Sequence, residues 1–166
     1  MLILRHSIKG KGENEDILTP EGVELAMNTG YAIKRRTAGN FTIGVSSGYQ
    51  RTTQTLACIL AGLGEVIPEG IIVHKGLATP RIAEWDKVIE KAGSLSLRAC
   101  SAISLSFVQE EARRIAGVLG EIFTYIPKDG RILVIGHNLL TECGVWHLTN
   151  NISLIPEEPL RECTGF

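Results

Sequence analysis

The chain has 166 residues, of which 44% are hydrophobic and 21% charged, and its formal net charge at pH 7 is −1. This is the composition and length of one globular domain with a full core, so we expect a single domain over residues 1–166. The small net charge excludes functions in which a global field attracts nucleic acid or an anionic membrane. The apolar runs are too short to span a bilayer and Met1 leads directly into one of them, so we expect no signal peptide and a cytoplasmic protein.

Apolar runs separated by polar or glycine-rich segments predict strands that alternate with helices. In chain order we expect a strand over 1–4, a loop over 7–16, a helix over 19–36, a strand over 41–45, a helix over 49–63 and a strand over 70–74. There follow a short helix over 81–91, a serine-rich loop over 94–106, a helix over 107–125, a strand over 131–135, a helix over 139–148 and a short or truncated last strand over 160–166. This alternation predicts an α/β fold with three layers, in which helices flank a mostly parallel central sheet.

Two histidines each follow a predicted strand. His6 comes after the first strand, directly behind Arg5, and His137 comes after the strand over 131–135. Arg51 lies in the first turn of the helix that follows the second strand. Because the carboxyl ends of parallel strands meet at one edge of a sheet, we expect these four side chains to converge there.

This set of side chains suits phosphoryl transfer. A neutral imidazole such as that of His6 attacks phosphorus and gives a covalent phosphohistidine. Arg5 and Arg51 would oppose protonation of His6 and offer forked donors to the phosphoryl oxygens, and His137 would add another donor. The four cysteines form no C-x-x-C pair and no carboxylate cluster has metal-ligand spacing, so we expect no metal and no cofactor.

Four segments resemble the signature of the histidine phosphatase superfamily, also called the phosphoglycerate mutase-like family. In order, they are Arg5-His6-Ser7, Leu18-Thr19-Pro20-Glu21-Gly22, Ser46-Ser47-Gly48-Tyr49-Gln50-Arg51-Thr52-Thr53-Gln54-Thr55 and Val134-Ile135-Gly136-His137-Asn138. The resemblance implies a phosphoglycerate mutase-like fold, with His6 as the nucleophile. It also implies that Arg5, Arg51 and His137 form the phosphate pocket.

Two of the chain's departures from that signature bear directly on the chemistry. Ser7 stands where the family has glycine, and serine would not tolerate a backbone angle that only glycine adopts. Many branches of the family carry their general acid in a Leu-x-Glu motif, but the corresponding stretch over residues 76–81 contains no carboxylate. We take Glu84 as the candidate acid, and Asp86 and Asp16 stay open as alternatives.

The missing acid bears on the substrate. An alkoxide leaving group needs protonation, whereas imidazole leaves a P–N bond more easily. The short bacterial phosphohistidine phosphatases of the family also resemble this chain in having Leu-x-Thr-Pro here, as in Leu77 to Pro80. We therefore expect a metal-independent phosphatase that acts on phosphohistidine in a protein partner. The alternatives are a phosphatase for small phosphate monoesters and a phosphate-binding regulatory module without turnover.

Overall fold

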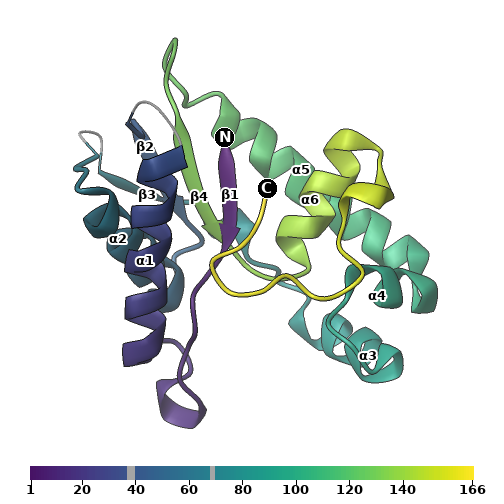
Figure 1. Ribbon diagram of the computed structural model, residues 1–166. Helices are drawn as coiled ribbons and strands as arrows, with labels where there is room; N and C mark the ends of the chain where they lie inside the picture. Colours follow the sequence, from purple (N-terminus) through teal and green to yellow (C-terminus); the bar gives the residue numbers. More distant parts are fainter. Residues whose placement is uncertain (37–39, 68–69) are drawn as a thin grey trace.

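The fold is built on four parallel strands. The computed structural model describes residues 1–36, 40–67 and 70–166 (Figure 1). The strands are β1 (Leu2–Arg5), β2 (Ile43–Ser46), β3 (Ile71–Val73) and β4 (Ile132–Gly136), and their order in the sheet is β1-β4-β2-β3. Every pair of neighbouring strands is parallel, which confirms the predicted sheet.

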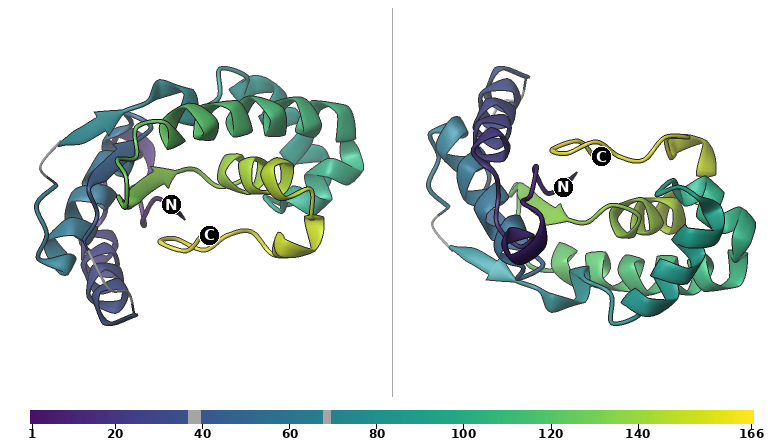
Figure 2. Two further views of the ribbon diagram at one scale, coloured as in Figure 1. Left: turned by 90° about the horizontal axis from the view of Figure 1, so that it is seen from above. Right: turned by 90° about the horizontal axis from the view of Figure 1, so that it is seen from below.

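Helices cover both faces of this sheet. They are α1 (Pro20–Arg36), α2 (Gln50–Leu63), α3 (Ile82–Ala92), α4 (Leu97–Ile103), α5 (Leu105–Phe123) and α6 (Leu140–Thr149). Single 3-10 turns form η1 (Gly12–Asn14), η2 (Lys75–Leu77) and η3 (Ile152–Leu154). Figures 1 and 2 show α1 and α2 on one face, α5 and α6 on the other, and α3 and α4 beyond the edge of the sheet on the α5 side. Within the described residues, no helix combines the length and the apolar character needed to cross a membrane.

The alternation of side chains along β4 produces two separate cores. Ile132 and Val134 belong to the cluster that contains α3, α4, α5 and α6. Leu133 and Ile135 belong to the cluster that contains α1 and α2. All four side chains are fully buried, because β4 is an inner strand covered on both faces. The result is the three-layer α/β architecture that the sequence predicts.

Glycine allows α1 and α2 to pack at very short range. A Cβ placed on Gly30 would lie 2.2 Å from a backbone carbonyl oxygen of α2, and one on Gly62 would lie 2.1 Å from a carbonyl oxygen of α1. Neither position has room for a side chain. This contact fixes α2, whose first turn carries Arg51, against the rest of the α1 layer.

The predicted loop over residues 94–106 is wrong, because this segment contains α4 and the start of α5. Leu97 and Cys100 lie three residues apart on α4 and are fully buried. Serine has only modest helix propensity, but burial of this apolar side outweighs it. The hydroxyl of Ser96 instead donates to the carbonyl oxygen of Glu157, at 2.5 Å, and joins α4 to the C-terminal segment.

The predicted last strand over residues 160–166 is also wrong. The segment runs antiparallel to β1 but forms only an isolated bridge, between Leu4 and Gly165. Cys163 has a φ of 57°, which interrupts the extended conformation that a strand requires. Backbone hydrogen bonds between Ile3 and Phe166, of 2.8 and 2.9 Å, nevertheless cover the outer edge of β1.

Candidate active site

The sheet brings the two histidines together. His6 directly follows β1 and His137 directly follows β4, and Arg5 is in register with Gly136 in this parallel pair. The backbone N–H of His6 donates to the carbonyl oxygen of Gly136 at 3.1 Å. The two imidazole rings lie 5.5 Å apart between centroids and meet edge to face. This is the convergence that the sequence predicts for the carboxyl edge of the sheet.

His6 is held as a neutral imidazole with one nitrogen available. Its Nδ1 lies 2.7 Å from the carbonyl oxygen of Ser7, which can only accept, so Nδ1 carries the proton. Nε2 therefore has a lone pair, and it makes no hydrogen bond to the described residues. The pKa of His6 is lowered to about 4, mainly by burial and in addition by the positive charges of Arg51 and Arg5. The ring is therefore in the state that a nucleophile needs at neutral pH.

His137 is also neutral and is fixed at both nitrogens. Its Nε2 lies 2.8 Å from the hydroxyl oxygen of Ser47, which follows β2. Its Nδ1 lies 3.5 Å from Nη2 of Arg51, and because a guanidinium cannot accept, Nδ1 is the unprotonated nitrogen. Burial lowers the pKa of His137 to about 3, with the charge of Arg51 as the next cause. Ser47 lies within a segment that the sequence singles out, yet its contact with His137 was not predicted.

Arg51 is oriented by the loop that precedes α1. Its Nη1 donates to Oδ1 of Asp16 at 2.7 Å, and Oδ2 of Asp16 accepts the backbone N–H of Gln50 at 3.1 Å. The guanidinium also lies over the ring of Tyr49, 4.3 Å from its centroid. Asp16, an alternative candidate for the general acid, thus caps α2 and fixes Arg51.

Arg5 is engaged on one side by the C-terminal segment. Its Nη1 donates to the carbonyl oxygen of Leu160, and its Nη2 pairs with Glu162 at 2.9 Å. Arg5 therefore cannot bind a phosphoryl group through both of its Nη groups in this arrangement. Its Nε is buried and finds no acceptor among the described residues, and the same holds for Nε of Arg51.

Ser7 fits its position without a glycine-like backbone. Its φ does not lie in the left-handed region, so the angle that would exclude serine is not required. The side chain is fully buried, and its hydroxyl donates to the carbonyl oxygen of Gly22 at 2.7 Å. Its backbone N–H donates to the hydroxyl of Thr55 at 2.9 Å. Ser7 therefore joins the end of β1 to α1 and α2.

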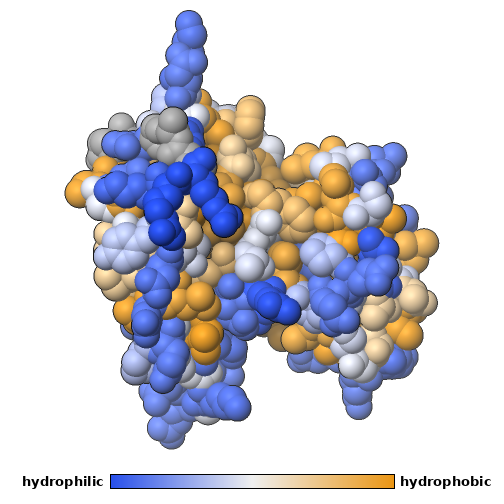
Figure 3. Space-filling view, in the orientation of Figure 1, coloured by the Kyte–Doolittle hydropathy of each residue, from blue (hydrophilic) through white to orange (hydrophobic). Residues whose placement is uncertain are grey.

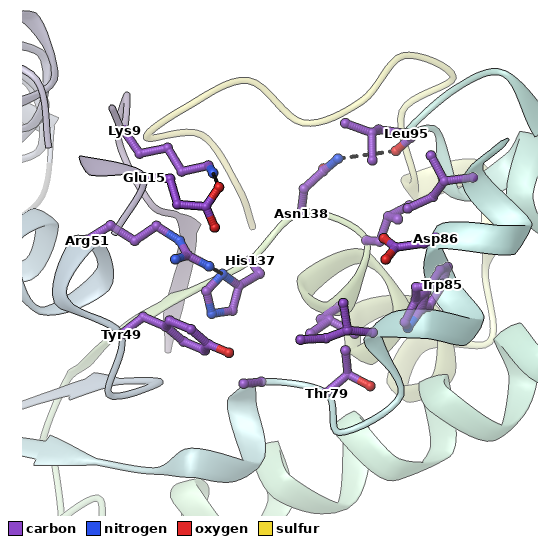
Figure 4. A pocket seen from close by; sticks show the side chains of 15 residues that line it. Lys9, Glu15, Tyr49, Arg51, Thr79, Trp85, Asp86, Leu95, His137 and Asn138 are labelled. Atoms are coloured by element: carbon purple, nitrogen blue, oxygen red, sulfur yellow. Dashed lines mark hydrogen bonds and ion pairs between the residues drawn. The ribbon is translucent and has the colours of Figure 1, made fainter. Parts of the chain in front are cut away.

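The structure does not bring Glu84 to the histidines. Glu84 is exposed, and Arg81 donates to both of its oxygens, at 2.7 and 2.5 Å. These hydrogen bonds lower the pKa of Glu84, whereas a general acid at neutral pH needs a raised pKa. Asp86, two residues later on α3, does line the pocket beside His137 (Figure 4).

A pocket of about 420 Å³ opens beside His137. Figure 3 shows the surface hollowed at this edge of the molecule, between the part built by α1 and the part built by α3. A second hollow, of about 340 Å³, is lined by Arg5 and His6. Lys9 and Glu15 line both hollows, so the two meet at this pair, whose charged atoms lie 3.7 Å apart. His6 thus lines one hollow and His137 lines the neighbouring one.

Glu142 is a buried carboxyl group that sequence analysis missed. Its Oε2 accepts the backbone N–H of Leu139 at 2.6 Å, and its Oε1 has no partner among the described residues. Leu139 has a φ of 60° and a ψ of −51°, at the centre of a tight turn in which the N–H of Leu140 donates to the carbonyl oxygen of Asn138 at 2.7 Å. Burial raises the pKa of Glu142 to about 7. Its position in the first turn of α6 is the available signal, because a glutamate there often caps the helix.

The comparisons with known proteins establish the fold. No protein-family model and no curated protein sequence matches this chain. A phosphoglycerate mutase from Bacillus anthracis superimposes with a TM-score of 0.65 at 19% identity, covering 99% of this chain and 91% of that one. A mycobacterial glucosyl-3-phosphoglycerate phosphatase gives 0.59 at 16% identity over 91% and 80% of the two chains. A putative phosphohistidine phosphatase from Agrobacterium tumefaciens gives 0.53 at 15% identity over 92% and 77%. The chain therefore has the fold of the phosphoglycerate mutase-like superfamily, as the sequence predicts.

Proposed function

We propose that this protein is a metal-independent phosphatase in which His6 takes the phosphoryl group from the substrate and water then removes it. The observation that carries the proposal is the state of His6. Its Nδ1 is fixed by the carbonyl oxygen of Ser7, and its pKa of about 4 leaves Nε2 unprotonated at neutral pH. The positive charges of Arg51 and Arg5 both act on this ring. A nucleophile held in this way beside anion-binding groups is the arrangement that phosphoryl transfer needs.

The arginines supply donors that still lack acceptors. Nε of Arg5 and Nε of Arg51 are both buried, and neither has a partner in the part of the chain that the structure describes. A buried donor without a partner costs about 1–3 kcal/mol, so an acceptor that reached either Nε would recover a free energy of that order. The carboxylates of Glu162 and Asp16 hold the Nη groups and so fix both guanidinium planes. Phosphoryl oxygens are suitable acceptors for donors fixed in this way.

The proposed reaction has two steps. Nε2 of His6 forms a bond to phosphorus while the bond from phosphorus to the leaving group breaks, and the electron pair departs with the leaving group. A water molecule then attacks the phospho-His6 intermediate, releasing phosphate and restoring His6. The negative charge of the phosphoryl group raises the pKa of the nearby His137, so that a protonated His137 can donate an N–H hydrogen bond to a phosphoryl oxygen. Loss of one such donor costs about 10²–10³ in rate.

The placement of the carboxylates favours substrates whose leaving group departs without a strong acid. Asp16 is bound to Arg51 and Glu84 to Arg81, so neither is free to protonate a leaving group. Asp86, which lines the pocket, is the one of the three candidate acids without such a partner among the described residues. Imidazole leaves a P–N bond as a neutral molecule once its other nitrogen is protonated, and this supports phosphohistidine as a substrate. A small phosphate monoester is the second candidate. The observation in its favour is the pocket of about 420 Å³, which has the volume of a small-molecule site.

The test is a comparison of initial rates on a phosphohistidine peptide and on p-nitrophenyl phosphate, both in EDTA. The variant His6→Ala should lose activity on both by several orders of magnitude, and the matched control His147→Ala, at an exposed position on α6, should retain it. Faster turnover of the peptide would support the phosphohistidine substrate, and faster turnover of the ester the small-molecule one. Binding of phosphate without turnover of either compound would instead identify a regulatory module.

A further inference from the structure

The larger pocket has two walls of different chemistry. One wall carries Tyr49, Arg51 and His137, and the opposite wall is built by α3 and by Leu95 (Figure 4). The two walls are joined by Asn138, whose side-chain amide donates to the carbonyl oxygen of Leu95 at 3.2 Å. A phosphoryl group held at His6 and Arg51 would therefore direct its leaving group toward α3.

The α3 wall exposes apolar side chains toward this space. Ile82 is 52% exposed and Leu95 is 43% exposed, and both line the pocket together with Ile89. Trp85, also on this wall, is buried and meets the ring of Phe107 edge to face, which holds α3 in place. When a ligand covers large apolar side chains that are exposed beside a site, the burial of their surface makes the free energy of binding more favourable.

The same wall carries a carboxylate without a counter-charge. Asp86 is exposed, lines the pocket and has no ion pair or hydrogen bond with the described residues (Figure 4). The other charges that line the pocket are already matched, because Lys9 pairs with Glu15 and Arg51 pairs with Asp16. The α3 wall therefore presents a negative charge beside an apolar surface.

We propose that the α3 wall is a leaving-group subsite for an apolar organic cation, such as an alkylammonium, an aryl ammonium or a protonated imidazole. The ring or chain would cover Ile82, Ile89 and Leu95, and the cationic group would pair with Asp86. The assignment rests on the proposed function for the phosphoryl end of the ligand. It adds the class of leaving group, and it disfavours substrates whose leaving group bears a carboxylate, since two like charges would then face each other.

Three matched aryl phosphates test the subsite: phenyl phosphates with a para aminoethyl, propyl or carboxyethyl group, which are cationic, neutral and anionic. Their affinities are measured by calorimetry on His6→Ala, which leaves the ligands intact. We expect the cationic compound to bind about threefold to fivefold more tightly than the neutral one, as for a solvent-exposed ion pair. The anionic compound should bind most weakly. Asp86→Asn should abolish this order, and Glu84→Gln, on the same helix but outside the pocket, should preserve it.

The apolar part is tested separately. Ile82→Ser combined with Leu95→Ser should weaken the binding of all three aryl phosphates by about fivefold and leave the affinity for inorganic phosphate unchanged.

Three outcomes would overturn the subsite: equal affinities for the three compounds, an order of affinities unaffected by Asp86→Asn, or no binding of any of them. The same compounds are then given to the wild-type protein. Absence of His6-dependent turnover, with the order of affinities intact, would refute the proposed function and leave the subsite standing. Tighter binding of a phosphohistidine peptide than of free phosphoimidazole would identify a protein side chain as the source of the cation.

Discussion

The buried carboxyl group of Glu142 makes a quantitative prediction about stability. Burial raises its pKa from 4.5 to about 7. Between these values the folded protein holds a proton that the unfolded chain has released, so the free energy of unfolding falls as the pH rises through this window. Above the folded pKa the loss is complete and levels off. Each pKa unit corresponds to about 1.4 kcal/mol, so the shift to about 7 is worth roughly 3 kcal/mol.

The perturbation is Glu142→Gln, which keeps the shape and an oxygen for the N–H of Leu139 but cannot titrate. Urea unfolding is followed by the fluorescence of Trp85 and Trp146 at a series of pH values from about 4.5 to 8, the window set by the shifted pKa. The measured quantity is the difference in free energy of unfolding between variant and wild type at each pH. The histidine contributions are common to both proteins and cancel in this difference.

We expect the variant to gain about 3 kcal/mol relative to the wild type as the pH rises across this window. Glu158→Gln, at an exposed position, is the control and should follow the wild type at every pH. Parallel curves for Glu142→Gln and wild type would refute the reasoning, because Glu142 would then titrate alike in the folded and unfolded states.

Three further predictions concern His6, Ser7 and Gly30. Because the pKa of His6 is lowered to about 4, kcat/KM should stay constant as the pH falls through 6.5 and should decrease only near pH 4. A decrease in kcat/KM centred at pH 6.5 would contradict a buried neutral nucleophile. Ser7→Gly should lower the free energy of unfolding by about 1–2 kcal/mol in urea titrations, since it removes the hydrogen bond to the carbonyl oxygen of Gly22, and should leave kcat within about twofold. A large loss of kcat without a loss of stability would disprove that role. Gly30→Ala should cost about 3 kcal/mol or more in thermal unfolding, because its Cβ would lie 2.2 Å from a backbone oxygen, whereas Gly117→Ala, with open space around it, should be neutral or slightly stabilising.

The sequence by itself determined the elements that repeat a local pattern. The apolar run before His6 and the one before His137 are buried strands, and Pro20 begins α1 as its residue type predicts. The convergence of His6 and His137 followed as well, because it needs only parallel strands whose carboxyl ends meet at one edge. The helix α4 was not predicted, because its buried side is created by packing against α3 and α5. The local composition of this serine-rich segment does not indicate that burial.

Only the tertiary structure decided which groups the functional side chains meet. Arg5 and Arg51 look equivalent in the sequence, yet Glu162, far along the chain, holds the first and Asp16 holds the second. Glu84 and Asp86 are close neighbours in the sequence, but on α3 Glu84 pairs with Arg81 and Asp86 lines the pocket. The lowered pKa of His6 and the raised pKa of Glu142 have one origin, the removal of water around a charge. Desolvation of this kind depends on what the whole fold places around a group, so it becomes defined only when the distant segments have packed.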